Sequence, residues 1–228
     1  MTHFDVRLQV RSVIERLVRE GTTVAREDGS REELFPIAAP PALGKTLGSW
    51  VRRENAKRTI EIGLAYGVSA LYICEALVAN EHPDARHVAI DPYQTHGPDG
   101  RGFANCGLQH LEEAGLLPII EHIEEESQIA LPRLLADGRT FDFAFVDGNH
   151  RFDRVFLDLY YLGRTIRRGG IVIVDDYELP GIVRAASFFL TNVGWELEDV
   201  SSGDGHHWAV LRTPKVEDAR PFTYFVDF

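Results

Sequence analysis

Hydrophobic and polar residues follow two different periods along the chain. Residues 5–19 place valine, leucine and isoleucine at helical spacing, which predicts an amphipathic helix at the start. From residue 58 onward the pattern becomes strand, glycine turn and helix, repeated several times. The run IVIVDD at residues 171–176 is apolar enough for a strand that is buried on both faces. This alternation predicts an α/β fold built on a doubly wound, mostly parallel sheet.

Both ends of the chain depart from the alternation. A polar, glycine-containing stretch at residues 20–33 leads to Pro40 and Pro41, which mark a turn before a second short helix. Near the C-terminus, residues 195–202 and 206–213 read as two strands around a Gly-Asp-Gly turn and predict an antiparallel hairpin. We expect one domain overall, with residues 1–57 as a helical cap or lid and residues 58–228 as the core.

Composition narrows the possible partners. The 228 residues are 44% hydrophobic, enough for one substantial core, and their formal net charge of −11 disfavours broad contact with nucleic-acid phosphates. No apolar run is long enough to span a bilayer or to act as a signal peptide. We therefore expect a cytoplasmic protein that binds neither nucleic acid nor membrane. The apolar C-terminal PFTYFVDF is expected to pack on the body or on a second subunit of a homo-oligomer.

A glycine turn follows the first strand of the core. In the sequence EIGLAYGVSAL, Gly63 and Gly67 allow the backbone to approach a ligand, and the next helix begins with free N–H groups. The spacing differs from the GxGxxG of NAD-binding folds. At the end of the next strand, Asp91 is placed to accept hydrogen bonds from the two hydroxyls of a ribose.

Three aspartates close two of the predicted strands. Asp147 ends FDFAFVD, and Asp175 and Asp176 end IVIVDD. Neighbouring carboxylates cannot all stay ionised unaided, and a divalent cation removes that conflict. Oxygen ligands alone favour Mg²⁺ or another oxygen-preferring cation such as Ca²⁺ or Mn²⁺. Taken singly, each aspartate could instead be a helix N-cap or a loop acid.

The glycine turn resembles that of class I S-adenosylmethionine-dependent methyltransferases, in particular the catechol and caffeoyl-CoA O-methyltransferases. The resemblance implies a seven-stranded, Rossmann-like sheet with helices on both faces and an antiparallel C-terminal hairpin. The segment ESQIALP at residues 126–132 resembles the stretch that borders the adenine in the catechol enzyme, although Ser127 could equally be a turn cap. The positions implied to contact the cofactor, besides Asp91 and Asp147, are Glu61, Gly63, Ala65, Gly67, Ser69, Ser127 and Gln128.

Residues 146–177 are most similar to the bacterial macrocin-type sugar O-methyltransferases. This resemblance implies that the three strand-end aspartates are metal ligands and that Asp147 also takes part in catalysis. Those enzymes have an acid two positions after the first metal ligand, where this chain has Asn149. His150 falls where the catechol enzyme has its catalytic lysine, and histidine titrates near neutrality, so it is the candidate base. Histidines 96, 206 and 207 are loop residues that could also line the site.

The sequence thus predicts an enzyme that transfers a methyl group from S-adenosylmethionine to a hydroxyl of a small molecule, with a divalent metal. Two alternatives are a NAD-type oxidoreductase on the same fold and a non-catalytic relative that only binds the cofactor. The acceptor stays open among a sugar hydroxyl, a catechol-like phenol and a carboxylated metabolite.

Overall fold

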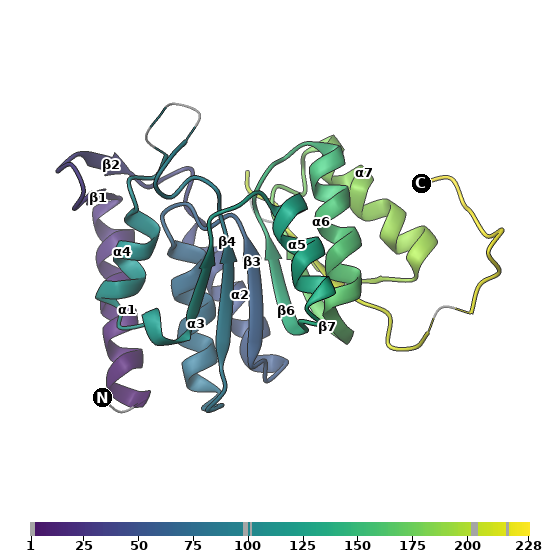
Figure 1. Cartoon of the computed structure of the whole chain (residues 1–228), viewed down its shortest axis with the longest axis horizontal. Coiled ribbons are helices and arrows are strands. Elements are labelled where there is room, and N and C mark those ends of the chain that lie inside the picture. Colours follow the sequence, from purple (N-terminus) through teal and green to yellow (C-terminus); the bar gives the residue numbers. More distant parts are fainter. Residues whose placement is uncertain (1–2, 98–99, 101, 202–204, 218) are drawn as a thin grey trace. The chain divides into compact units, whose positions relative to one another are not determined.

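The computed structural model describes residues 3–97, 100, 102–201, 205–217 and 219–228. The chain forms two compact units, residues 1–126 and 127–228 (Figure 1). The predicted division at residue 57 stays a prediction. Within the described ranges, no helix is long and apolar enough to cross a membrane.

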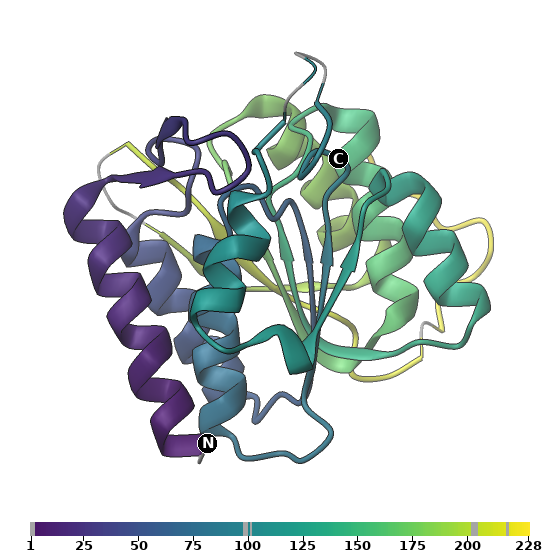
Figure 2. The same ribbon diagram turned by 60° about the vertical axis from the view of Figure 1, so that its left-hand side comes forward.

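The first unit places three parallel strands beside helices. Strand β4 pairs with β3 on one side and with β5 on the other, both in parallel. Helices α1 and α2 both pack on α3, which Figures 1 and 2 show as neighbouring helices. Its elements are α1 (His3–Glu20), β1 (Thr22–Val24), β2 (Arg31–Glu33), α2 (Pro41–Arg53), β3 (Arg58–Ile62), α3 (Val68–Ala79), β4 (Arg86–Ile90), α4 (Cys106–Glu113), the 3-10 turn η1 (Leu117–Ile119) and β5 (Ile120–Ile123).

The second unit continues the strand–helix alternation and closes with the hairpin. Strands β6 and β7 pair in parallel, whereas β9 pairs antiparallel with both β7 and β8. Residues 203 and 204 of the predicted Gly-Asp-Gly turn lie outside the described residues. The elements are α5 (Ser127–Ala136), β6 (Phe141–Val146), α6 (Phe152–Thr165), β7 (Ile166–Val174), α7 (Pro180–Phe188), the π-helical turn η2 (Phe189–Val193), β8 (Glu196–Val200) and β9 (Ala209–Arg212).

The strands follow the order β5-β4-β3-β6-β7-β9-β8. They form a mixed, mostly parallel sheet of seven strands, which confirms the predicted fold class. The central strands are almost entirely buried: every residue of Phe143–Val146 and Ile171–Val174 is at most 2% exposed. Such strands carry apolar residues on both faces, which explains why their sequences lack the alternation of a half-exposed strand.

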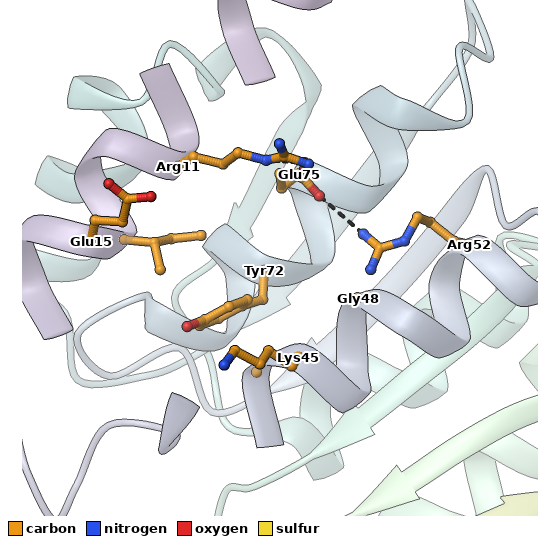
Figure 3. A pocket seen from close by; sticks show the side chains of 9 residues that line it. Arg11, Glu15, Lys45, Gly48, Arg52, Tyr72 and Glu75 are labelled. Atoms are coloured by element: carbon orange, nitrogen blue, oxygen red, sulfur yellow. Dashed lines mark hydrogen bonds and ion pairs between the residues drawn. The ribbon is translucent and has the colours of Figure 1, made fainter. Parts of the chain in front are cut away.

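A buried carboxylate ties the three helices of the first unit together. The Glu75 side chain on α3 is 8% exposed and lies within 3.1 Å of guanidinium nitrogens of Arg7 and Arg11 from α1 and of Arg52 from α2. A buried charge is tolerated when it is paired and hydrogen-bonded, so this cluster fixes how α1 and α2 meet α3. The same helices line an open pocket of about 260 Å³ beside Glu75 (Figure 3).

The packing of α2 on α3 depends on a glycine. A Cβ atom at Gly44 would lie 2.2 Å from the Tyr72 ring, and even the Cγ atom at the base of that ring would be only 2.8 Å away. Any side chain at position 44 must therefore displace the ring or the helix.

We expect Gly44→Ala to lower the free energy of unfolding by about 1–3 kcal/mol, because overpacking outweighs the better helix propensity of alanine. Urea denaturation measures the effect. The matched control is Gly181→Ala in α7, where the nearest atom to the new Cβ is 3.4 Å away, an ordinary contact. That control should be neutral or stabilising by up to about 1 kcal/mol. Equal effects of the two substitutions would contradict the packing argument.

Candidate functional site

The Asp91 carboxylate is hydrogen-bonded to the backbone of the glycine loop, residues 63–67. It follows β4 directly and is 3% exposed. One of its carboxylate oxygens accepts hydrogen bonds from the backbone N–H groups of Leu64 (2.9 Å) and Ala65 (2.7 Å), and the other accepts one from Tyr93 (2.7 Å). A carboxylate has about four acceptor positions, so these bonds leave room for a further donor. The predicted contact of Asp91 with a ribose stays a prediction, and its observed partners are backbone amides.

The loop itself has a left-handed backbone at three positions. The φ angles are +93° at Gly63, +44° at Ala65 and +75° at Gly67. A Cβ atom at Gly67 would lie 2.8 Å from the carbonyl oxygen of Gly107, so position 67 needs glycine for both its φ angle and its close approach. The side-chain amide of Gln94 donates to the Ala65 carbonyl at 2.8 Å and fixes the turn from the other side.

Buried polar side chains next to the glycine loop form a series of contacts. The Ser69 hydroxyl donates to Oε2 of Glu61 at 2.8 Å, and Oε1 of Glu61 is 3.1 Å from Nε2 of His87. The other ring nitrogen of His87 is 2.8 Å from the Thr59 hydroxyl. Glu61 and His87 have no exposed surface, and contact of Glu61 with a cofactor stays a prediction. The sequence pattern did not identify His87 as a candidate residue. The parallel register of β3 and β4, which pairs His87 with Thr59, is the feature that would have indicated it.

The two predicted adenine-side residues open α5 in the second unit. The Ser127 hydroxyl donates a hydrogen bond to Asp158 of α6, which is 1% exposed. Burial raises the pKa of Asp158 to about 7, although the bond from Ser127 and the nearby Arg154 oppose the rise. Gln128, the next residue, is half-buried. Contact of Ser127 and Gln128 with an adenine stays a prediction.

The strand-end aspartates of the second unit converge because β6 and β7 are parallel and in register. Val146 is opposite Val174, and the N–H of Asp175 donates to the Val146 carbonyl at 3.0 Å. Asp147 and Asp175 therefore leave the sheet side by side. Asp176 has a φ of +51°, an uncommon backbone conformation for a residue other than glycine. Strain of this kind tends to gather at functional sites.

Two histidines complete what we call the acid–histidine cluster: Asp147, His150, Asp175, Asp176 and His206. Nε2 of His150 is 2.8 Å from Oδ2 of Asp176 and 3.6 Å from Oδ1 of Asp147. Nε2 of His206 is 2.9 Å from Oδ1 of Asp175. Potential ligand atoms lie within 4.8 Å of one another in two sets, Asp147 with His150 and Asp176, and Asp175 with Asp176 and His206. These sets have the donors and the spacing that a metal ion requires.

Charge is shared unevenly within the cluster. Burial raises the pKa of Asp175 to about 9, and the negative charge of Asp147 adds to the rise. Burial likewise raises the pKa of Asp147. The hydrogen bond from His150 instead holds the pKa of Asp176 below its usual value. Hydrogen bonds to Asp147 and Asp176 raise the pKa of His150 to about 10, so without a cation its ring is protonated at neutral pH.

Two buried atoms of the cluster lack hydrogen bonds. Oδ1 of Asp175 and Nε2 of His206 lie 2.9 Å apart but are not aligned as a hydrogen bond, and neither has another hydrogen-bond partner in the described part of the chain. Buried polar atoms are normally satisfied by a hydrogen bond or a metal. A divalent cation between them fits this arrangement.

Asn149 has a structural explanation. Its side-chain oxygen accepts a hydrogen bond from the N–H of Arg151 at 3.0 Å, which shapes the turn before α6. The side chain is exposed, so the residue that replaces the expected acid fixes the backbone next to His150.

Comparisons with known proteins identify the family of this chain. The sequence matches the methyltransferase domain family over residues 60–177. It is 30% identical to a caffeoyl-CoA O-methyltransferase of Populus kitakamiensis over 73% of this chain and 64% of that enzyme, slightly less than two thirds of its length. It is 29% identical to a flavonoid 3',5'-methyltransferase of Vitis vinifera over 73% of this chain and 75% of the relative.

A solved structure shares the fold. It is that of the O-methyltransferase TomG from Streptomyces achromogenes in complex with S-adenosylmethionine, with a TM-score of 0.67 and 22% identity over 90% of this chain and 89% of the other. Together these matches confirm the predicted resemblance to class I O-methyltransferases.

The raised pKa of Asp158 predicts how the stability of the folded protein changes with pH. The folded state holds its proton up to about pH 7, whereas the unfolded state releases it near pH 4, so wild-type stability falls as the pH rises through this window. Asparagine cannot ionise. Asp158→Asn should therefore become more stable relative to wild type between pH 4 and pH 8, by about 4 kcal/mol at most, as measured by urea denaturation at each pH. Asp153→Asn, on the exposed face of the same helix, should show no such trend, and a flat difference for Asp158→Asn would refute the assignment.

Proposed function

We propose that this chain, which belongs to the methyltransferase domain family, transfers the methyl group of S-adenosylmethionine to a hydroxyl oxygen of a small molecule. One observation carries the proposal: the family match over residues 60–177 includes the glycine loop, Asp91 and all three strand-end aspartates. The relatives are named for caffeoyl-CoA and flavonoid methylation, which supports a phenolic hydroxyl as the acceptor.

The glycine loop and the start of α3 are suited to the amino-acid end of the cofactor. The helix begins after Gly67, without a side-chain cap, so N–H groups of its first turn are available to a ligand. A helix N-terminus favours a carboxylate, and the methionine moiety of S-adenosylmethionine carries one. Asp91 and the Glu61–Ser69 pair hold the loop in place for this contact.

The acid–histidine cluster is suited to acceptor activation. The three strand-end aspartates, which fall in two sets of possible ligand atoms that share Asp176, would hold a divalent cation, whose charge would lower the pKa of a hydroxyl beside it. The sequence-based expectation for this ion is Mg²⁺. Among the described residues, the buried Oδ1 of Asp175 accepts no hydrogen bond, which supports a cation at this point.

We assign to His150 the role of taking the acceptor proton. Its ring is about half exposed, and Nε2 is fixed 2.8 Å from Asp176. Only the neutral ring can accept a proton, and the two carboxylates beside it favour the charged form. A cation that compensated those carboxylates would lower the pKa of His150, which could then serve as a general base.

We expect Asp175→Asn, alone or with Asp176→Asn, to reduce methyl transfer at least 100-fold while leaving the affinity for S-adenosylmethionine within about threefold of wild type. Calorimetric titration measures cofactor affinity, and transfer of a labelled methyl group to a panel of catechols, including caffeoyl-CoA, measures turnover. Excess chelator should inhibit the wild type and added metal should restore it.

The same assays test the alternatives. Binding of NADH but not of S-adenosylmethionine would favour an oxidoreductase, and cofactor binding without turnover on any hydroxylated acceptor would favour a non-catalytic relative. Full activity in excess chelator would exclude the metal. Asp153→Asn, an exposed aspartate on α6, is the control for the loss of a carboxylate and should retain wild-type turnover.

If His150 is the base, His150→Gln should lower kcat about 10- to 1,000-fold and remove the rising limb of the pH–rate profile, while KM for S-adenosylmethionine stays within about threefold. The profile is measured from pH 5 to pH 9 with saturating metal. A variant with reduced kcat but an unchanged profile shape would show that His150 only positions the aspartates.

A further inference from the structure

We infer that Nε2 of His206 is a ligand of the cation, so that the site is a mixed nitrogen and oxygen site that selects Fe²⁺, Co²⁺, Ni²⁺ or Zn²⁺ over Mg²⁺. The inference rests on the cation site of the proposed function and revises its sequence-based choice of ion. It adds a ligand, His206, that lies 30 residues after the last of the three aspartates.

The geometry around Asp175 carries the inference. Asp175 is 3% exposed, and its Oδ1 has no hydrogen-bond partner among the residues that the structure describes. Nε2 of His206 lies 2.9 Å from it and is likewise buried without a hydrogen bond among these residues. Together with Asp176 they offer three ligand atoms within 4.8 Å of one another. One ion would satisfy both buried atoms at once.

The backbone holds His206 in this place. The N–H of Tyr177, next to Asp176, donates to the carbonyl of His207 at 2.8 Å. The N–H of Trp208 donates to the Ser201 hydroxyl at 2.9 Å, and the N–H of Ser201 donates to the Trp208 carbonyl at 3.0 Å. These bonds tie the segment before β9 both to the turn after β7 and to the end of β8. His206 is thus carried by a hydrogen-bonded segment, which favours a preformed ligand.

Ligand chemistry sets the choice of ion. Mg²⁺ prefers oxygen ligands and retains several waters, whereas an imidazole nitrogen suits Fe²⁺, Ni²⁺ and Zn²⁺ and binds divalent metals more tightly along the series from Mn²⁺ to Cu²⁺. A site with three carboxylates alone would not need His206. Its position against the buried Asp175 therefore favours a metal that accepts nitrogen.

The test compares Co²⁺ and Mg²⁺ binding to the metal-free full-length protein by calorimetry. His206→Asn should weaken Co²⁺ binding at least tenfold while changing Mg²⁺ affinity less than threefold. The matched control is His207→Asn, the adjacent histidine, whose backbone carbonyl accepts a hydrogen bond from the turn after β7. It should leave the affinities for both ions within twofold of wild type.

A second measurement uses the wild-type protein. Its Co²⁺ complex should show a hyperfine-shifted, exchangeable imidazole N–H resonance in the proton NMR spectrum, and this resonance should be absent in His206→Asn. If that resonance is missing from the wild type, or if His206→Asn leaves Co²⁺ affinity unchanged, His206 is not a ligand and the inference fails. Equal weakening of Co²⁺ and Mg²⁺ binding would overturn the proposed selectivity. None of these readouts needs an acceptor or turnover, so failure of the methyl-transfer assay would bear on the proposed function alone.

Discussion

The second unit depends on how the negative charge of three neighbouring carboxylates is compensated at the ends of β6 and β7. The parallel register that pairs Val146 with Val174 forces Asp147 and Asp175 together. In a buried setting they cannot all be ionised without partners. Without a cation, the raised pKa of Asp175, about 9, keeps it protonated at neutral pH, and the proton on His150 compensates Asp176. A divalent cation bound by the cluster would replace those protons as the compensating positive charge.

Much of the fold can be predicted from the sequence because buried parallel strands are encoded by continuous runs of apolar residues. The apolar runs that became β6 and β7 could be assigned from composition alone, and the aspartates after them had to meet once the strands were parallel. The short β1–β2 pair is different. Its residues are almost all polar, and only the antiparallel pairing of Thr22–Val24 with Arg31–Glu33 reveals it. The local sequence pattern therefore predicts strands that are buried in the core. It does not predict short polar strands that are recognised by their backbone pairing.

The candidate site was less accessible to sequence reasoning for the same reason. Asp91 could be selected as a strand-end acid, but its partners are backbone N–H groups of Leu64 and Ala65, which no side-chain pattern displays. His87 lies in the predicted strand HVAID, and only its register opposite Thr59 brings it to Glu61. His206 lies 30 residues after Asp176 in the sequence, so its approach to Asp175 emerges only in three dimensions. In each case the decisive contact depends on backbone path rather than on residue type.

The chain compensates buried carboxylates in two chemically different ways, and the difference separates scaffold from site. Glu75 is paired with the guanidinium groups of Arg7, Arg11 and Arg52, which link α1 and α2 to α3. The partners in the acid–histidine cluster are imidazoles, which can lose a proton and then bind a metal through the freed nitrogen. Arginine at those positions would neutralise the aspartates equally well but would compete with any cation. Histidine rather than arginine at these positions therefore favours a site in which a metal cation can take the place of the protons that compensate the aspartates.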